Sequence, residues 1–417
     1  MKVSNSSVLL KFGKIKDKYG FFPSLLLGIG KITYRFFISF FIKICRFLIK
    51  INKNAILLYS VPDFAENSKA IYEFLIRNGY HLKYDIFWIV EEPNKYIEHE
   101  TNATFLKRYN VFRELPLKSI YYHMKVQYVM TTHGFHIPRR KSNKGQVYIE
   151  LFHGSGYKAS EVEGNPIINF DYHIVSGPLF VKKMSEFWHT DNHKLFLPTG
   201  FPRYDWLLQD SPKAEKLIKH IKGNNNKIII WMPTFRKTGS DYFKEGLINS
   251  FPLVKNDEEW KRLDHFCAEK GLILIIKLHI LQTNYNIDFT KYSNILTISN
   301  QELEKEGVDL YRFIKYTDAL ISDYSSIAID YLVLNKPIAF ALDDFDMYKK
   351  LRGFVFNNPL DFMPGHHVYN FEDLVLFLAD IADNQDPFIN KRNVIKRVAI
   401  KESNHYCFDV LNKIGIK

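Results

Sequence analysis

Short apolar runs alternate with amphipathic stretches from residue 54 onward, and this alternation limits the possible folds more than any other feature of the chain. Strands of a parallel sheet are covered on both faces, so each reads as a nearly continuous apolar run, and helices supply the crossovers. The runs that we expect to form strands are residues 55–61, 84–90, 126–131, 147–152, 172–176, 195–198, 228–232, 272–276, 295–298, 319–322 and 337–341. The pattern predicts an α/β protein with parallel sheets.

The length of 417 residues exceeds what one ordinary hydrophobic core serves and predicts two domains. Apolar residues make up 46% of the chain and charged residues 24%, which excludes a disordered chain. The polar stretch 213–227 contains a Gly-Asn-Asn-Asn sequence and is the best candidate for a linker. We therefore expect an N-terminal segment 1–54, a first domain 55–212, the linker 213–227 and a second domain 228–417.

The formal net charge of +12 is concentrated near the N-terminus. Residues 1–53 hold eleven Lys and Arg against one acid, Asp17, whereas the other 364 residues hold 46 basic and 44 acidic ones. A nucleic-acid-binding domain normally presents a basic face on its folded part. The nearly neutral body therefore argues against a nucleic-acid partner.

A basic amphipathic segment at 25–51 predicts attachment to an anionic membrane surface. Its cations fall within an arc of about 120° on a helix, and Phe, Ile and Leu fill the other faces. These cations are Lys31, Arg35, Lys43, Arg46 and Lys50. The longest uncharged runs, 19–30 and 36–42, are shorter than the roughly 18–20 residues that span a bilayer, so we expect peripheral binding. The alternative is a helix that packs on the protein's own core with its basic stripe in water.

Three scattered cysteines, Cys45, Cys267 and Cys407, show no paired spacing of a metal site or disulfide framework and fit a reducing, cytoplasmic compartment. The N-terminus has no short apolar core followed by a small-residue cleavage site, which argues against secretion. Walker, GxGxxG, HExxH and GxSxG patterns do not occur in the sequence. No Asp and Glu cluster indicates a metal, so we predict neither a metal nor a cofactor.

Polar clusters follow four of the expected strands directly, at the carboxyl ends where open parallel sheets bind ligands. The strand at 147–152 runs into the sequence HGSGYK, and the strand at 228–232 runs into PTFRK. The strand at 272–276 runs into KLH, and the strand at 319–322 runs into DYSS. The candidate residues are His153, Gly154, Lys158, Thr234, Arg236, Lys277, His279, Ser322, Asp323, Ser325 and Ser326.

Each cluster has a functional and a structural interpretation. Lys277 and His279 are two residues apart and point to one side of a strand, although a solvated strand end reads the same way. Ser325 and Ser326 either cap the following helix or present backbone N–H groups to a phosphate. His153 is a natural proton acceptor for a hydroxyl, or else a structural residue of a glycine turn.

At these residues the sequence resembles the CDP-glycerol glycerophosphotransferase family of teichoic-acid and capsule-polymer synthesis. A spaced set of motifs between about 145 and 375 carries the resemblance: LFHGSGYK at 151–158, TGFPRYD at 199–205, MPTFRK at 232–237, IKLH at 276–279, SDYSSIAIDY at 322–331 followed by KPIAF, and LRGF at 351–354 followed by Pro364 and Gly365. The order and spacing of these motifs make the signal specific.

The resemblance implies a GT-B fold, in which two Rossmann-like domains face a cleft that holds the donor, and monotopic attachment to the cytoplasmic face of the membrane. It implies that His153 is the base for the acceptor hydroxyl and that Lys277 and His279 grip the donor pyrophosphate, His279 being the second candidate catalytic histidine. The expected contacts of donor phosphate and nucleotide are Thr234, Arg236, Lys277, Ser322, Asp323, Ser325, Ser326 and Asp330. The expected acceptor-side residues are Gly154, Lys158 and Arg203.

Two motifs depart from the family pattern. The family usually reads HGTPLK where this chain has HGSGYK, and Arg followed by Pro-His where this chain has KLH. Lys is a point charge that cannot reproduce the bidentate fork of Arg. The identity of the alditol and of the acceptor is therefore open.

These features together predict transfer of glycerol phosphate or ribitol phosphate from CDP-glycerol or CDP-ribitol to a hydroxyl of a membrane-linked saccharide or polymer, with release of CMP. Such catalysis depends on positioning and charge stabilisation. Two alternatives stay open at this point: a GT-B glycosyltransferase that uses a nucleotide sugar, and a non-catalytic membrane scaffold.

Overall fold

The structure is a computed structural model that describes residues 40, 44–45, 48–108, 116–134, 145–159, 168–223, 226–233, 251–277 and 287–417. Most of the basic segment 1–54 thus lies outside the described residues. The chain divides into two compact units. Unit 1 comprises Met1–Glu150 and Asn169–Asp171, and unit 2 comprises Leu151–Ile168 and Tyr172–Lys417.

Unit 1 is built on parallel strands that follow the order β3-β2-β1-β4-β5. Its strands are β1 Asn52–Tyr59, β2 Asp85–Val90, β3 Thr104–Lys107, β4 Val126–Thr131 and β5 Val147–Glu150. Its helices are α3 Glu66–Arg77 and α4 Leu117–Lys125, with short 3-10 turns η1 Tyr80–Leu82 and η2 Pro93–His99. Leu57, Ile89 and Val129 are fully buried in one core cluster, against which Tyr122 of α4 packs.

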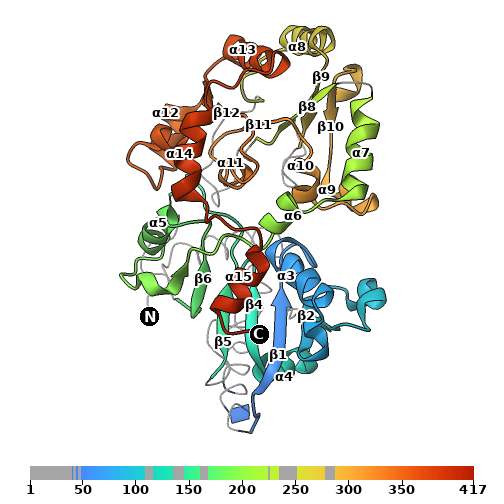
Figure 1. Ribbon diagram of the computed structural model, residues 1–417, viewed down its shortest axis with the longest axis vertical. Helices are drawn as coiled ribbons and strands as arrows, with labels where there is room; N and C mark the ends of the chain where they lie inside the picture. The colour runs from blue at the N-terminus through green and yellow to red at the C-terminus, as the bar shows by residue number, and fades with distance from the viewer. Residues whose placement is uncertain are drawn as a thin grey trace, which may run out of the picture. The chain divides into compact units, whose positions relative to one another are not determined.

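Unit 2 contains a six-stranded parallel sheet of order β10-β9-β8-β11-β12-β13 (Figure 1). The strands are β8 Lys227–Trp231, β9 Leu272–Ile276, β10 Ile295–Thr297, β11 Ala319–Ser322, β12 Ile338–Ala341 and β13 His366–Val368. All five residues of β9 are buried, as expected for a strand covered on both faces. Unit 2 also contains the parallel pair β6 Tyr172–Ile174 and β7 Phe196–Leu197.

Helices of unit 2 connect and cover these strands (Figure 1). They are α5 Leu179–Phe187, α6 Tyr204–Leu208, α7 Pro212–Lys222, α8 Asp257–Lys270, α9 Asn300–Lys305, α10 Leu310–Ile314, α11 Ile327–Tyr331, α12 Phe345–Leu351, α13 Phe371–Ala382, α14 Ile389–Ala399 and α15 Tyr406–Lys413. The 3-10 turns are η3 His193–Leu195, η4 Phe289–Lys291 and η5 Pro359–Phe362.

Local sequence signals set the ends of α8, which packs beside α13 on one face of the six-stranded sheet (Figure 1). The Asn256 side chain accepts a hydrogen bond from the backbone N–H of Glu259 at 2.9 Å, which caps the first turn. Three acidic residues follow in that turn, where they oppose the positive end of the helix dipole. Gly271 ends the helix with a φ of 62°, a left-handed conformation that glycine adopts without strain.

The expected α/β architecture with parallel sheets is confirmed, and each of the eleven expected strands coincides with an observed one. The stretch expected as a linker, 213–227, contains most of α7, and the two compact units divide between Glu150 and Leu151. Within the part of the chain that the structure describes, no helix is long and apolar enough to cross a membrane.

Candidate functional site

The strand order of unit 2 marks a ligand-binding position between β8 and β11. Successive strands run outward from β8 to β10 in one direction and from β11 to β13 in the other. In such sheets ligands bind at the carboxyl ends of the two strands where the direction switches. The backbone N–H of Met232, which follows β8, donates to the carbonyl of Ile321 in β11 at 2.8 Å, so the two strand ends lie side by side.

Lys277 lies at this edge of the sheet, directly after β9. Its backbone N–H donates to the carbonyl of Trp231 in β8 at 2.9 Å. The residue is only 7% exposed, and burial lowers the pKa of its ammonium group, because a low-dielectric environment disfavours the charged form. A phosphate anion beside Lys277 would favour the charged form.

The segment that follows β11 is held rigidly. Tyr324 is fully buried, its hydroxyl donates to Asp344 at 2.8 Å, and its ring lies 4.1 Å from that of Tyr348. Ser325 and Ser326 are only half-buried, whereas Ser322 and Asp323 are fully buried. Ser326 occupies the N-cap position of α11, a helix of five residues, and its side chain makes no capping hydrogen bond there. The capping interpretation thus does not account for the Ser326 hydroxyl.

The turn that carries His153 lies directly on Ser326. Gly154 has a φ of 140°, and a Cβ built on it would lie 2.4 Å from the Ser326 Oγ. Phe152 has a φ of 55°, which is rare for a bulky residue. The side chain of His153 between them is exposed. The sequence therefore brings the HGSG turn and the DYSS segment together, as expected for two parts of one site.

Arg203 and Asp330 form a buried ion pair behind the same turn. The Arg203 Nη2 lies 2.7 Å from Asp330 Oδ2 and donates to the backbone carbonyl of His153 at 2.9 Å. Asp330 also accepts hydrogen bonds from the hydroxyls of Tyr204 and Tyr311. The exposed fractions of the Arg203 and Asp330 side chains are 2% and 0%. The structure thus places both residues in the packing that supports the turn.

Lys158 lies at the far end of the turn, beside the LRGF motif. It forms an isolated antiparallel bridge with Phe354, and the Val355 N–H donates to the Tyr157 carbonyl at 2.8 Å. Tyr157 is fully buried and donates its hydroxyl to the carbonyl of Phe362 at 2.9 Å. This pairing fixes residues 157–159, while the Lys158 side chain remains half-buried.

A buried histidine lies beneath Phe152. The His173 ring is 4.6 Å from that of Phe152, and burial lowers the pKa of His173 to about 3. A smaller effect in the same direction comes from the charge of His153, which shows that the two imidazoles are close enough to interact. Sequence reasoning missed this histidine, because it lies within the short strand β6 and belongs to no polar cluster.

Unit 1 has its own switch in strand order, between β1 and β4. The Ser68 hydroxyl donates to the Tyr59 carbonyl and lies 2.8 Å from the Thr132 hydroxyl, and both side chains are fully buried. Glu150 accepts hydrogen bonds from the Thr131 hydroxyl and the Gly134 N–H, each at 3.1 Å. Sequence reasoning missed these residues, since single Ser and Thr residues at strand ends carry no distinctive spacing.

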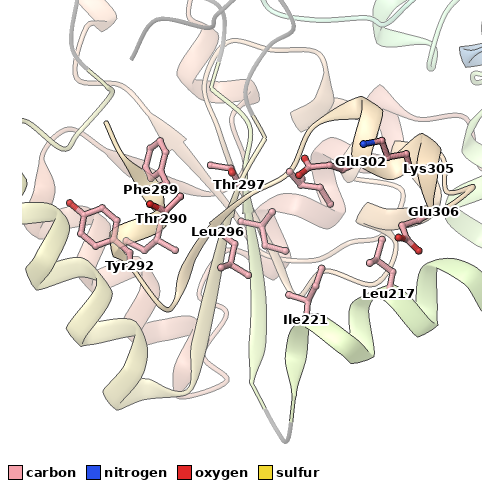
Figure 2. Close-up of a pocket in the computed structure, with 13 residues that line it drawn as sticks. Leu217, Ile221, Phe289, Thr290, Tyr292, Leu296, Thr297, Glu302, Lys305 and Glu306 are labelled. Carbon is pink, nitrogen blue, oxygen red and sulfur yellow. The ribbon is translucent and has the colours of Figure 1, made fainter. Parts of the chain in front are cut away.

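A hollow of about 500 Å³ lies elsewhere in unit 2, along the outermost strand β10. Figure 2 shows Phe289 and Tyr292 at one end and Leu217 and Ile221 of α7 toward the other. Charged side chains also line the hollow toward the α7 end: Glu302 and Lys305 of α9, and Glu306, which follows α9. No described residue of the expected site lines this hollow. The described residues with expected chemistry lie instead at the carboxyl ends of β9 and β11 and in the turn that contacts Ser326.

Three expected site residues, Thr234, Arg236 and His279, lie outside the described residues. The others that the structure describes lie in unit 2, although the sequence assigned His153, Lys158 and Arg203 to the first domain. Within the described part of the chain, no group of three His, Cys, Asp or Glu side chains is arranged to hold a metal ion.

Comparison with known proteins identifies a family. The family model described as CDP-Glycerol:Poly(glycerophosphate) glycerophosphotransferase matches residues 38–404. The teichoic acid poly(glycerol phosphate) polymerase of Bacillus spizizenii is 26% identical over 323 residues, which are 72% of this chain and 76% of that protein. The teichoic acid ribitol-phosphate polymerase TarK of Staphylococcus aureus is 27% identical over 376 residues, which are 82% of this chain and 66% of that protein.

The fold is similar to that of a solved relative. A structure of a variant of the wall teichoic acid polymerase TagF superposes with a TM-score of 0.69 and 20% sequence identity, covering 92% of each chain. At that identity the likeness shows the fold alone. It agrees with the parallel-sheet architecture described above.

Proposed function

Since the chain belongs to the CDP-glycerol:poly(glycerophosphate) glycerophosphotransferase family, we propose that it transfers an alditol phosphate from a CDP-alditol to a hydroxyl of a polymer acceptor. CDP-glycerol is the first donor to test because the family description contains it, and CDP-ribitol is the second because relatives include ribitol-phosphate polymerases. The acceptor that we propose is a membrane-linked saccharide or polymer.

In the proposed reaction the acceptor oxygen forms a bond to the phosphorus that carries the alditol. The bond between this phosphorus and the bridging oxygen breaks, and CMP leaves. The acceptor hydroxyl loses its proton to the imidazole of His153. Lys277 and the half-buried Ser325 and Ser326 stabilise the charge on the donor phosphates. Charge stabilisation of this kind supplies most of the catalysis of phosphoryl transfer.

The observation that carries the proposal is the contact between the His153 turn and the end of β11. The turn is close enough to leave no room for a Cβ at Gly154, and the imidazole of His153 is nevertheless exposed. His153, a candidate proton acceptor, thus lies in a turn that contacts the carboxyl end of β11, and parallel sheets bind ligands at the carboxyl ends of their strands.

The basic segment 25–51 is the proposed means of attachment to the membrane. Its cations and aromatic side chains suit anionic headgroups at the cytoplasmic face, where we propose that the protein acts as a peripheral enzyme. Attachment of this kind would bring the enzyme close to a membrane-linked acceptor.

A donor panel tests the proposed function. The protein is incubated with membranes and CDP-glycerol, CDP-ribitol or nucleotide sugars, and CMP release and label transfer to polymer are measured. We expect CMP release coupled to transfer from one or both CDP-alditols. Incorporation of sugar from a nucleotide sugar, with no transfer from either CDP-alditol, would show a glycosyltransferase instead.

A further inference from the structure

We propose that Arg203 is a positioning residue, held by Asp330, which fixes the backbone of the turn that presents His153. The inference rests on the proposed role of His153 as proton acceptor. The sequence predicts that Arg203 contacts the acceptor and that Asp330 contacts the donor nucleotide. We infer instead that both residues act inside the protein.

The Asp330 carboxylate is fully occupied by the protein itself. It is 0% exposed and accepts from the Arg203 guanidinium and from the hydroxyls of Tyr204 and Tyr311. These partners come from α6 and α10 and from the residue before α6, while Asp330 lies in α11. A carboxylate with three internal donors and no exposed surface is poorly placed to bind a nucleotide.

The guanidinium of Arg203 is held on its faces as well as its edge. Its Cζ lies 4.5 Å from the centroid of the Tyr311 ring and 5.3 Å from that of Phe201. Such stacking suits the planar guanidinium and would not suit a lysine. With 2% of its side chain exposed, Arg203 acts on what it touches inside the protein, and one of those groups is the His153 carbonyl.

A restraint on that carbonyl fixes the most unusual backbone of the turn. The His153 carbonyl belongs to the peptide that leads into Gly154, whose φ is 140°, and Phe152 on the other side has a φ of 55°. A positive φ at a bulky residue such as Phe152 persists only where the surroundings hold it, whereas a glycine such as Gly154 adopts a positive φ without strain. Loss of the Arg203 hydrogen bond would free the peptide to rotate and move the imidazole away from the β11 edge.

Two variants and a matched control test the proposal. Arg203→Met removes the guanidinium but keeps much of its volume, and Tyr204→Phe removes one hydroxyl that helps to hold Asp330. Arg392→Met is the control, because Arg392 is equally buried, pairs with Asp386 and donates to the carbonyl of Asn335 at 3.3 Å. These hydrogen bonds of Arg392 do not involve residues 151–158.

The first measurement needs no activity. Hydrogen exchange of the peptide that covers 151–158 is followed by mass spectrometry in the parent and each variant. We expect exchange of this peptide to accelerate at least about tenfold in Arg203→Met and less in Tyr204→Phe, with no change in Arg392→Met. If Arg203→Met folds and this peptide exchanges at the same rate as in the parent, the proposal is overturned. If Arg203→Met does not fold, unchanged exchange and unchanged turnover in Tyr204→Phe overturn it.

The second measurement asks whether Arg203 acts through His153. We expect Arg203→Met to lose about 10- to 100-fold in turnover at a donor Kd within about twofold of the parent. The double variant His153→Ala/Arg203→Met should be no slower than His153→Ala alone, because residues that act as a unit are not additive. If the loss of turnover in the double variant equals the product of the losses in the two single variants, the proposal is overturned. Absence of transfer by the parent from either donor would refute the proposed function, while the exchange measurement still decides whether Arg203 holds the turn.

Discussion

At the scale of single residues, Lys277 at the end of β9 has a charge that depends on whether the site contains an anion. Burial lowers the pKa of Lys277, so part of the cost of folding lies in keeping this cation out of water. An anionic donor would offset that cost at the moment of binding. Burial also lowers the pKa of Lys336, whose ammonium group donates to the carbonyls of Lys315 and Thr317, each at 2.6 Å.

Lys277→Ala should weaken binding of CDP-glycerol by about 10- to 150-fold, the effect of losing about 1.5–3 kcal/mol from a charge-assisted hydrogen bond. Calorimetry on the parent and variant measures the change. The parent's affinity should also fall at alkaline pH as the ammonium loses its proton, and this loss should be absent in the variant. Lys336→Ala serves as the control and should lower the melting temperature without changing donor affinity. Equal donor affinity in the parent and Lys277→Ala would exclude a phosphate contact at this position.

His153→Ala should bind donor nearly as the parent does but lose roughly 10²–10⁴-fold in turnover, the usual contribution of a positioned proton acceptor. The parent's rate should fall as pH decreases and the imidazole takes up a proton, whereas the residual rate of the variant should not show that decrease. Pre-steady-state rates and calorimetry separate the two effects. A stable variant with near-parental turnover would refute the assignment.

At the scale of structural elements, the turn at 151–158 and the segment after β11 act as one packed assembly. A Cβ at Gly154 would meet both the Oγ of Ser326, at 2.4 Å, and its Cβ, at 2.7 Å. The antiparallel bridge between Lys158 and Phe354 fixes the other end of the turn. Small changes at either end should therefore reach His153.

Gly154→Ala should lower turnover by at least about tenfold, because the new methyl group displaces Ser326 and the φ of 140° strains any residue with a Cβ by about 1–3 kcal/mol. Ser326→Gly removes both clashing atoms, so adding Gly154→Ala to Ser326→Gly should cost less turnover than adding Gly154→Ala to the parent does. Gly223→Ala is the matched control, with a positive φ of 55° and nothing within 4 Å of its Cβ position. If Gly154→Ala and Gly223→Ala behave alike in steady-state assays, close packing at the turn is not important for the reaction.

Strands were more predictable from the sequence than the contacts of the site. Apolar runs such as LILII at Leu272–Ile276 are easily recognised as strands, because a strand that is buried on both faces consists almost entirely of apolar residues. The runs missed were β3 and β13, of four and three residues, and β13 reads His-His-Val, which has no apolar pattern. The Arg203–Asp330 pair joins residues 127 positions apart, and only the folded chain reveals it.

At the scale of the whole molecule, the buried His123 and His173 link the stability of the protein to pH. Burial lowers the pKa of His123 to about 3 and that of His173 to about 3, against about 6.5 in an unfolded chain. The unfolded state therefore binds more protons than the folded state between these values. The folded state is fully stabilised above about pH 6.5 and loses up to about 1.4 kcal/mol per pH unit for each histidine as the pH falls toward 3.

Melting temperatures measured between pH 7.5 and pH 5 test this linkage. The parent should melt at a lower temperature as the pH decreases, and the double variant His123→Gln/His173→Gln should show a shallower dependence. His265→Gln, at an exposed position of α8, is the control and should follow the parent. Parallel curves for the parent and the double variant would locate the pH dependence in other groups.

Removal of residues 1–47 tests the proposed membrane attachment. The deletion stops before β1, which begins at Asn52, and it removes nine Lys and Arg with one acid. The parent should sediment with anionic vesicles and dissociate at high salt, because ions screen the attraction between cations and headgroups. The truncated protein should stay in solution with donor affinity unchanged. Equal sedimentation of both proteins would place the attachment elsewhere in the chain.

Residues 151–159, which follow β5, belong to the same compact unit as the six-stranded sheet. His153 and the end of β11 consequently belong to one compact unit, and the packing of Gly154 on Ser326 sets their mutual orientation when that unit folds. A base that is free in solution would lose rotational and translational entropy in every catalytic cycle. His153 loses this entropy once, when the protein folds. For such an enzyme the effective concentration of base at the donor phosphate is a property of the folded chain and should not depend on how much substrate is present.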